Sequence, residues 1–224
     1  MAEVIVALDV DPTEAWQVVE RIDDLRWVKI GPTLFLEAGP SFVDRLKRRG
    51  LRVFLDLKWH DIPHQVAGAV SVAAALGVDM ATLHASGGVE MMEAAVRAAG
   101  QLRLAAVSVL TSHTRASYGS AVGRPDVDVE REVIRLAQLA VSCGLSAVVC
   151  SPHELKAVRT TVPRDSWLVT PGVRPRGSAL DDQERAATPR EAAEWGATHL
   201  VIGRPVTRAN DPAVVYREIC EGLE

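Results

Sequence analysis

Short apolar runs rich in β-branched residues alternate with longer Ala/Leu/Val patterns of helical periodicity along the 224 residues. This alternation predicts a parallel sheet, because each strand is followed by a crossover helix that returns the chain to the same edge. Eight such units favour a single-domain (β/α)8 TIM barrel over residues 1–224, rather than an open doubly wound sheet. The predicted strands cover residues 4–8, 27–30, 52–57, 80–84, 104–110, 147–150, 167–170 and 200–203.

Helix boundaries are marked by capping residues before proline and by glycine after the last turn. An Asp, Ser or Thr side chain accepts hydrogen bonds from first-turn N–H groups, and proline suits the first helical position because no donor is needed there. Glycine ends helices because it adopts the left-handed conformation at little cost. The expected starts are Asp11-Pro12, Ser151-Pro152, Thr188-Pro189 and Asp211-Pro212, with capping boxes at Ser151/Glu154 and Thr188/Glu191, and the expected stops are Gly50, Gly77, Gly100, Gly144 and Gly196.

Composition narrows the class of protein further. Hydrophobic residues make up 48% of the chain and aromatic residues only 4%, which indicates an aliphatic core. The net charge of −4, without arginine-aromatic patches, argues against a nucleic-acid partner. The three cysteines lack metal-ligand spacing, and the sequence has neither a signal peptide pattern nor a membrane-spanning apolar run. We therefore expect a cytoplasmic protein without a metal site or membrane association.

Three charged residues stand at the end of the third predicted strand and in the turn beyond it. The two-residue period of this strand, continued one residue past its predicted end, places Phe54, Asp56 and Lys58 on one face. A lysine flanked by Asp56, and by Asp61 one turn later, can stay protonated when partly desolvated, because nearby negative charge favours the ammonium form. These residues are typical of a proton donor held in place, although an ion cluster that only closes a strand end has the same composition.

The first two strands also end in charged residues, Asp9 and Lys29. Because the chemistry of such barrels takes place where the strands end, Asp9 and Lys29 are expected at the same mouth as the charges of the third strand. The alternatives are a helix cap for Asp9, a role that Asp11 fills better, and a surface lysine before the Gly31 turn for Lys29.

The seventh and eighth strands end in Gly-Val-Arg and Gly-Arg, at Gly172 to Arg174 and at Gly203-Arg204. Loops at these two positions of a barrel commonly bind phosphate through glycine N–H groups and a forked arginine. One such pair is often only a turn, but two at the two expected strand ends predict a phosphorylated ligand. An anionic ligand would then be bound locally by a protein of net negative charge.

These motifs together resemble the orotidine 5′-phosphate decarboxylases over the whole chain. The resemblance implies a (β/α)8 barrel without a cofactor, which acts in UMP biosynthesis and forms homodimers with shared active sites. The segments that carry the resemblance are Ala7-Leu8-Asp9, Val28-Lys29-Ile30-Gly31, Asp56-Leu57-Lys58-Trp59-His60-Asp61-Ile62-Pro63, Leu110-Thr111-Ser112, Val169-Thr170-Pro171-Gly172-Val173-Arg174, Asp182-Gln183 and Ile202-Gly203-Arg204-Pro205.

The resemblance also implies a role for each site residue. Lys58 corresponds to the donor that protonates C6 of the pyrimidine after carbon dioxide leaves, and Asp56 to the carboxylate that faces the substrate carboxylate. Asp61 is expected from the partner subunit, where it completes an array with Lys29. The substrate-binding set is Asp9 and Lys29 at the ribose, Thr111 at the pyrimidine, Arg174, Gln183, Gly203 and Arg204 at the phosphate, with Asp56, Asp61, Ile62 and Gln65.

One position departs from the family pattern. Many members carry Asn-Thr after Asp-Ile-Pro, and the threonine approaches the ribose of the neighbouring site, whereas this chain has His64-Gln65. Two other functions share part of the pattern. Sugar-phosphate decarboxylases and synthases on the same scaffold use an Asp-x-Lys-x-x-Asp segment with magnesium, and a catalytically silent nucleotide-binding protein would keep only the phosphate site.

Overall fold

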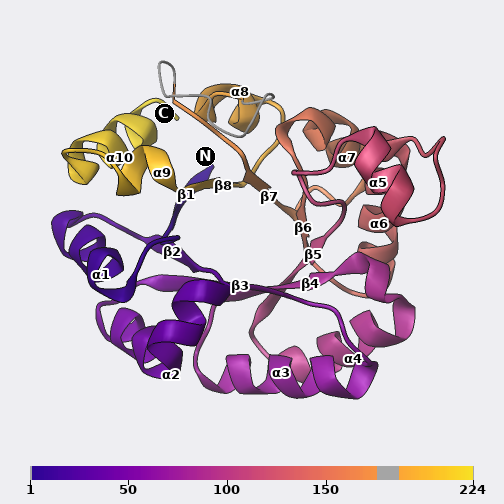
Figure 1. Cartoon of the computed structure of the whole chain (residues 1–224), viewed down its shortest axis with the longest axis horizontal. Coiled ribbons are helices and arrows are strands. Elements are labelled where there is room, and N and C mark those ends of the chain that lie inside the picture. The colour runs from indigo at the N-terminus through magenta and orange to yellow at the C-terminus, as the bar shows by residue number, and fades with distance from the viewer. Residues whose placement is uncertain (1, 176–186, 224) are drawn as a thin grey trace.

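The computed structural model describes residues 2–175 and 187–223, which form a closed barrel of parallel strands (Figure 1). The strands follow one another around the barrel in sequence order, and β8 pairs with β1 to close it. The predicted (β/α)8 barrel is therefore confirmed. The strands are β1 (Glu3–Ala7), β2 (Trp27–Ile30), β3 (Arg52–Trp59), β4 (Met80–His84), β5 (Arg103–Val107), β6 (Ala147–Val149), β7 (Trp167–Pro171) and β8 (His199–Ile202).

Helices form a ring around the outside of the strands (Figure 1). Two short 3₁₀ segments, η1 (Ala85–Gly87) and η2 (Pro152–Glu154), precede the helices after β4 and β6. Among the described residues no helix has the length and apolar character needed to cross a bilayer. The α-helices are α1 (Pro12–Arg21), α2 (Pro32–Arg48), α3 (Pro63–Ala75), α4 (Val89–Ala99), α5 (Arg115–Ala121), α6 (Val129–Ser142), α7 (Leu155–Thr161), α8 (Pro189–Glu194), α9 (Arg204–Thr207) and α10 (Pro212–Glu221).

The core has two parts, because the strands bury both faces. One cluster lies between the strands and the helix ring and consists mainly of Val, Leu, Ile and Ala. The other fills the barrel interior, where bulky Trp27, Phe54 and Met80 interlock with smaller side chains. Each fully buried large apolar side chain contributes about 1.5–3 kcal/mol. Apolar side chains thus fill the barrel interior, and the polar residues lie beyond them at the C-terminal ends of the strands.

The predicted helix boundaries are largely confirmed. Asp11 accepts hydrogen bonds from the N–H groups of Thr13 and Glu14 at the start of α1. Asp211 caps α10 in the same way, and Thr188 forms the predicted capping box before α8. The five glycines expected to end helices all have positive φ, which matches the left-handed conformation that glycine tolerates: Gly50, Gly77, Gly100, Gly144 and Gly196.

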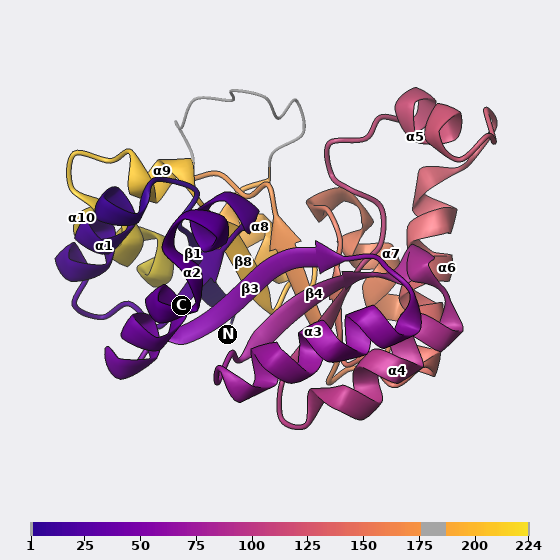
Figure 2. The same ribbon diagram turned by 60° about the horizontal axis from the view of Figure 1, so that its bottom comes forward.

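Two details of the prediction are wrong. Ser151 does not cap a helix through the backbone; its hydroxyl instead contacts the Glu154 carboxylate, and a 3₁₀ turn begins there. The fifth strand ends at Val107 rather than at residue 110. The long connection over residues 111–128 contains α5, which Figure 2 shows projecting beyond α6. Its capping box joins Thr114 to Ser117, where a serine takes the place of the usual Glu or Gln.

Candidate active site

The C-terminal ends of the strands surround a cavity of about 510 Å³. This volume lies within the range of roughly 300–1,000 Å³ that is common for small-molecule sites. A hollow of about 580 Å³ between α8 and α10 lies on the outer surface instead, away from the charged strand ends. The apolar floor of the cavity is formed by Ala7, Phe54, Val149, Val169 and Val201.

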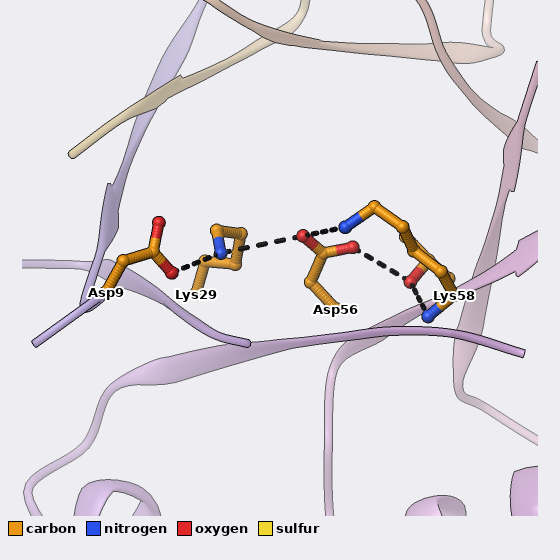
Figure 3. Close-up of polar contacts among 5 residues, drawn as sticks. Asp9, Lys29, Asp56 and Lys58 are labelled. Atoms are coloured by element: carbon orange, nitrogen blue, oxygen red, sulfur yellow. Dashed lines mark hydrogen bonds and ion pairs between the residues drawn. The ribbon is translucent and has the colours of Figure 1, made fainter. Parts of the chain in front are cut away.

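Four charged side chains lie in a row along one wall of this cavity (Figure 3). Lys29 Nζ lies 2.8 Å from Asp9 Oδ1 and 3.5 Å from Asp56 Oδ2. Lys58 Nζ lies 2.8 Å from the same Asp56 oxygen. Carboxylates and ammonium groups thus alternate across three neighbouring strands. The sequence predicted this grouping for Asp9, Lys29, Asp56 and Lys58, and the structure brings these residues together.

Burial within the row increases toward its centre. The side chains of Lys29 and Asp56 are 9% and 11% exposed, whereas those of Lys58 and Asp9 are 35% and 61% exposed. Burial would raise the pKa of Asp56, but the ammonium groups of Lys29 and Lys58 and a hydrogen bond from Thr82 together lower that pKa below its usual value. Asp56 is therefore ionised at neutral pH and holds negative charge between two cations.

The strand that carries Asp56 and Lys58 is irregular at this point. Leu55 pairs with Ala81 and Trp59 pairs with Leu83, so three residues of β3 lie opposite the single residue Thr82 of β4. Lys58 has a φ of 51°, the one positive φ of a non-glycine residue in the described ranges. A left-handed conformation costs about 1–2 kcal/mol for a residue with a side chain. The two-residue period predicted the shared face of Asp56 and Lys58 but not this bulge.

Gly31 gives the first ion pair room to form. A Cβ at this position would lie 3.2 Å from Asp9 Oδ1 and 3.5 Å from Lys29 Nζ, and the first of these contacts is tighter than side chains normally make. The absence of a side chain therefore lets Lys29 and Asp9 meet directly above the end of β2.

The ends of β7 and β8 complete the lining of the cavity, and β8 lies next to β1. Gly172, Arg174, Gly203 and Arg204 all line it, as the Gly-Arg patterns predicted. The Arg174 N–H donates to the Ala187 carbonyl at 2.9 Å, which ties the two sides of the connection after β7 together. Gln183, expected near the phosphate, lies outside the described residues.

Three expected site residues are not part of the cavity of their own chain. Asp61, Ile62 and Gln65 are exposed, and Asp61 Oδ1 accepts a hydrogen bond of 2.6 Å from the Ile62 N–H. Asp61 thus does not line the cavity that holds the charged row of its own chain, and its assignment to either subunit stays a prediction. Thr111, by contrast, is exposed but lines the cavity as expected.

Sequence reasoning missed two polar residues at this site. Arg208 lines the cavity just after α9, and buried Thr82 hydrogen-bonds to the charged row. The strand period would have placed Thr82 on the same face as Met80, toward the barrel interior. Arg208 follows a helix of only four residues, and no motif marks it.

Residues 2–219 match the family model described as orotidine 5′-phosphate decarboxylase / HUMPS family. The chain belongs to the orotidine 5′-phosphate decarboxylase / HUMPS family. A protein named orotidine 5′-phosphate decarboxylase from Anaeromyxobacter sp. (strain K) is 51% identical over 197 residues, covering 88% of this chain and 86% of the relative. Another of that name, from Parasynechococcus marenigrum (strain WH8102), is 45% identical over 230 residues, covering 98% of this chain and 93% of the relative.

A solved structure supports the same assignment to the orotidine 5′-phosphate decarboxylase / HUMPS family. The orotidine 5′-phosphate decarboxylase from Lactobacillus acidophilus superposes with a TM-score of 0.89 at 33% identity, and the match covers 100% of both chains. Family membership and the charged row together identify the cavity as the candidate active site of an enzyme.

Proposed function

We propose that this chain decarboxylates orotidine 5′-phosphate to UMP in pyrimidine biosynthesis, without a cofactor and with Lys58 as the proton donor. The observation that carries this proposal is the row Asp9–Lys29–Asp56–Lys58 on one wall of a cavity that is also lined by the Gly-Arg pairs after β7 and β8. Such a cavity combines a place for a reacting carbon with a place for a remote phosphate.

Lys58 supplies both charge and a proton at the reacting carbon. When the bond between C6 and the carboxylate breaks, carbon dioxide leaves and the electron pair remains on C6. A fixed ammonium group stabilises this developing negative charge without reorganising, and it then transfers one proton to C6. Lys58 is suited to the task because Asp56 holds its Nζ at 2.8 Å. The neutral amine that remains regains a proton from solvent.

Asp56 favours loss of the substrate carboxylate. A second negative charge placed about 4 Å away would be repelled by roughly 4 kcal/mol at an effective dielectric constant of about 20. Lys29 and Lys58 offset part of this repulsion, since both lie within ion-pair distance of Asp56. The repulsion disappears as neutral carbon dioxide departs. Asp56 therefore raises the free energy of the bound substrate more than that of the product.

Binding energy from the phosphate would keep the repelled substrate in place. Arg174, Gly203 and Arg204 lie together on the side of the cavity away from Lys58 and offer a guanidinium fork and backbone donors. Asp9 and Lys29 would contact the ribose hydroxyls, and Thr111 the pyrimidine. Contacts remote from C6 contribute to the rate by holding the reacting group in position.

We further propose that the functional unit is a homodimer with shared sites. Ile62 is 63% exposed and Leu36 is 83% exposed, near the starts of α3 and α2 on the mouth side of the barrel. Val72 and Val89, on α3 and α4, add two more exposed apolar side chains. A two-fold interface over these helices would cover them and carry Asp61, Ile62 and Gln65 to the partner's cavity. Completion of each site by the other subunit would explain why Asp61 is exposed and does not line the cavity of its own chain.

The magnesium-dependent sugar-phosphate enzymes of the same scaffold are the competing class. Their chemistry needs strand-end carboxylates that are open to a metal ion. In this chain Asp9 and Asp56 instead make ion pairs with lysine ammonium groups. This pairing favours charge compensation by lysine, and activity on orotidylate should be unchanged in excess EDTA.

The direct test is the loss of ultraviolet absorbance of orotidylate on addition of the purified protein. Conversion to UMP at catalytic protein concentrations, with and without EDTA, supports the proposal. Tight UMP binding without any conversion would indicate a silent nucleotide-binding protein instead. Activity that appears only with added magnesium would favour the competing class.

A further inference from the structure

Thr82 is buried in β4 directly beneath the charged row, and its hydroxyl makes two hydrogen bonds there. The hydroxyl accepts from the Lys58 N–H at 2.8 Å and donates to Asp56 Oδ1 at 3.0 Å. The side chain is 1% exposed and lies on the neighbouring strand, so its position is fixed by the barrel rather than by the row. One hydroxyl therefore links the backbone of one charged residue to the carboxylate of the other.

The bulge in β3 explains why this link is needed. Between the pairs Leu55↔Ala81 and Trp59↔Leu83, β3 has three residues against one on β4, so regular strand pairing is interrupted. The Lys58 N–H lies within this interruption, and the Thr82 hydroxyl oxygen accepts its hydrogen bond. Lys58 meanwhile has a φ of 51°, a conformation that persists only where the surroundings hold it.

The same hydroxyl sets the orientation of the Asp56 carboxylate. Thr82 holds Oδ1, which leaves Oδ2 to receive both ammonium groups, Lys58 at 2.8 Å and Lys29 at 3.5 Å. A carboxylate that rotated about its last bond would lose this division between its two oxygens. Thr82 thus acts on Asp56 and Lys58 at once, although it does not line the cavity.

We propose that Thr82 is a positioning residue for the decarboxylation, whose hydroxyl fixes the Asp56 carboxylate and the left-handed backbone of Lys58 in the reactive arrangement. This inference rests on the proposed function for its kinetic consequences. The hydrogen bond by which Thr82 holds the Lys58 backbone does not depend on which substrate binds.

The test compares Thr82→Val, which keeps the shape but removes the hydroxyl, with Thr82→Ser, which keeps the hydroxyl. A misplacement of about 1 Å can slow a reaction about 100-fold, so Thr82→Val is expected to lower kcat by about 10- to 100-fold. UMP affinity should change by less than about threefold, because phosphate contacts supply most of it. Thr82→Ser should restore most of the rate.

A pH profile separates positioning from general damage. Loss of the Thr82 hydrogen bond removes one of the contacts that lower the pKa of Asp56, so that pKa rises in Thr82→Val. The acid limb of kcat/KM should then move to higher pH in Thr82→Val and stay in place in Thr82→Ser. Thr170→Val is the matched control, since Thr170 is equally buried, does not line the cavity, and its hydroxyl has no hydrogen-bond partner among the described residues. Its kinetics should equal those of the wild type.

Hydrogen exchange supplies the measurement that does not depend on turnover. The Lys58 amide should exchange faster in Thr82→Val than in the wild type or Thr82→Ser. If Thr82→Val does not fold, Thr82→Ala replaces it, because alanine removes the hydroxyl without adding bulk. Unchanged Lys58 exchange, or wild-type kcat in the variant without the hydroxyl, would overturn the inference. Failure of the wild type itself to convert orotidylate would overturn the proposed function, while the exchange measurement would still decide whether Thr82 holds Lys58.

Discussion

Lowering the pH below neutrality is expected to destabilise the barrel through His199, which closes its N-terminal end. The ring of His199 is 3% exposed and lies 4.1 Å from the Trp167 ring and 5.6 Å from the Trp27 ring, measured between centroids. Nδ1 lies 2.9 Å from the Thr198 hydroxyl. Nε2 is buried without a hydrogen-bond partner among the described residues, so a proton added there would lack an acceptor.

The size of the effect follows from the pKa of this ring. Burial lowers the pKa of His199 from 6.5 to about 4; Glu3 opposes this shift, whereas Arg103 and Arg52 add to it. The unfolded chain takes up a proton below about pH 6.5 and the folded chain only near pH 4, so the free energy of unfolding falls as the pH drops through this window. Between about pH 7 and about pH 4.5 the loss is about 2–3 kcal/mol.

Denaturant unfolding at the two pH values measures this loss. His199→Phe keeps an aromatic ring between the tryptophans and removes the titrating group, so its stability should fall less on acidification than that of the wild type, by about 2 kcal/mol. His153→Gln removes an exposed histidine and should behave as the wild type does. Equal acid sensitivity of His199→Phe and the wild type would refute the reasoning, because all other titrating groups are the same in both.

Two further predictions concern the candidate site. Arg204→Ala should weaken UMP binding by about 10- to 100-fold, since it removes a charge-assisted contact worth about 1.5–3 kcal/mol, and should also slow turnover; unchanged titration and kinetics would remove Arg204 from the phosphate site. Mixing inactive Lys58→Ala and Asp61→Ala subunits should restore about a quarter of wild-type activity, because half of the dimers are mixed and half of their sites are intact. Proven heterodimers without restored activity would assign Asp61 to its own subunit.

The parts of the fold that local chemistry determines could be predicted from the sequence. Asp11 and Asp211 stand directly before proline, and each caps the helix that follows. Gly203 and Arg204 line the cavity because the C-terminal ends of all parallel strands meet at the same mouth. The order of the strands and the grouping of charged strand ends follow from the same rule.

Contacts between residues distant in the chain, and the local geometry of some turns, could not be predicted. The left-handed conformation of Lys58 is supported by Thr82, which lies 24 residues away along the chain and makes its contact only once β3 and β4 pair with a bulge. Ser151 and Glu154 have capping-box spacing, yet the turn there becomes 3₁₀ and the two side chains contact each other. Asp61 lies beyond the end of β3, where the strand period no longer applies, and it is exposed.

The most direct test of the account is the rate at which Lys58→Ala converts orotidylate, measured beside the wild type and Lys156→Ala, which removes an exposed lysine of α7 that does not line the cavity. Loss of a general acid typically costs about 10²- to 10⁴-fold, so turnover should fall by at least about 100-fold while UMP binding persists. Lys156→Ala should turn over like the wild type. Conversion by Lys58→Ala within about tenfold of the wild-type rate would contradict the assignment of Lys58 as the proton donor.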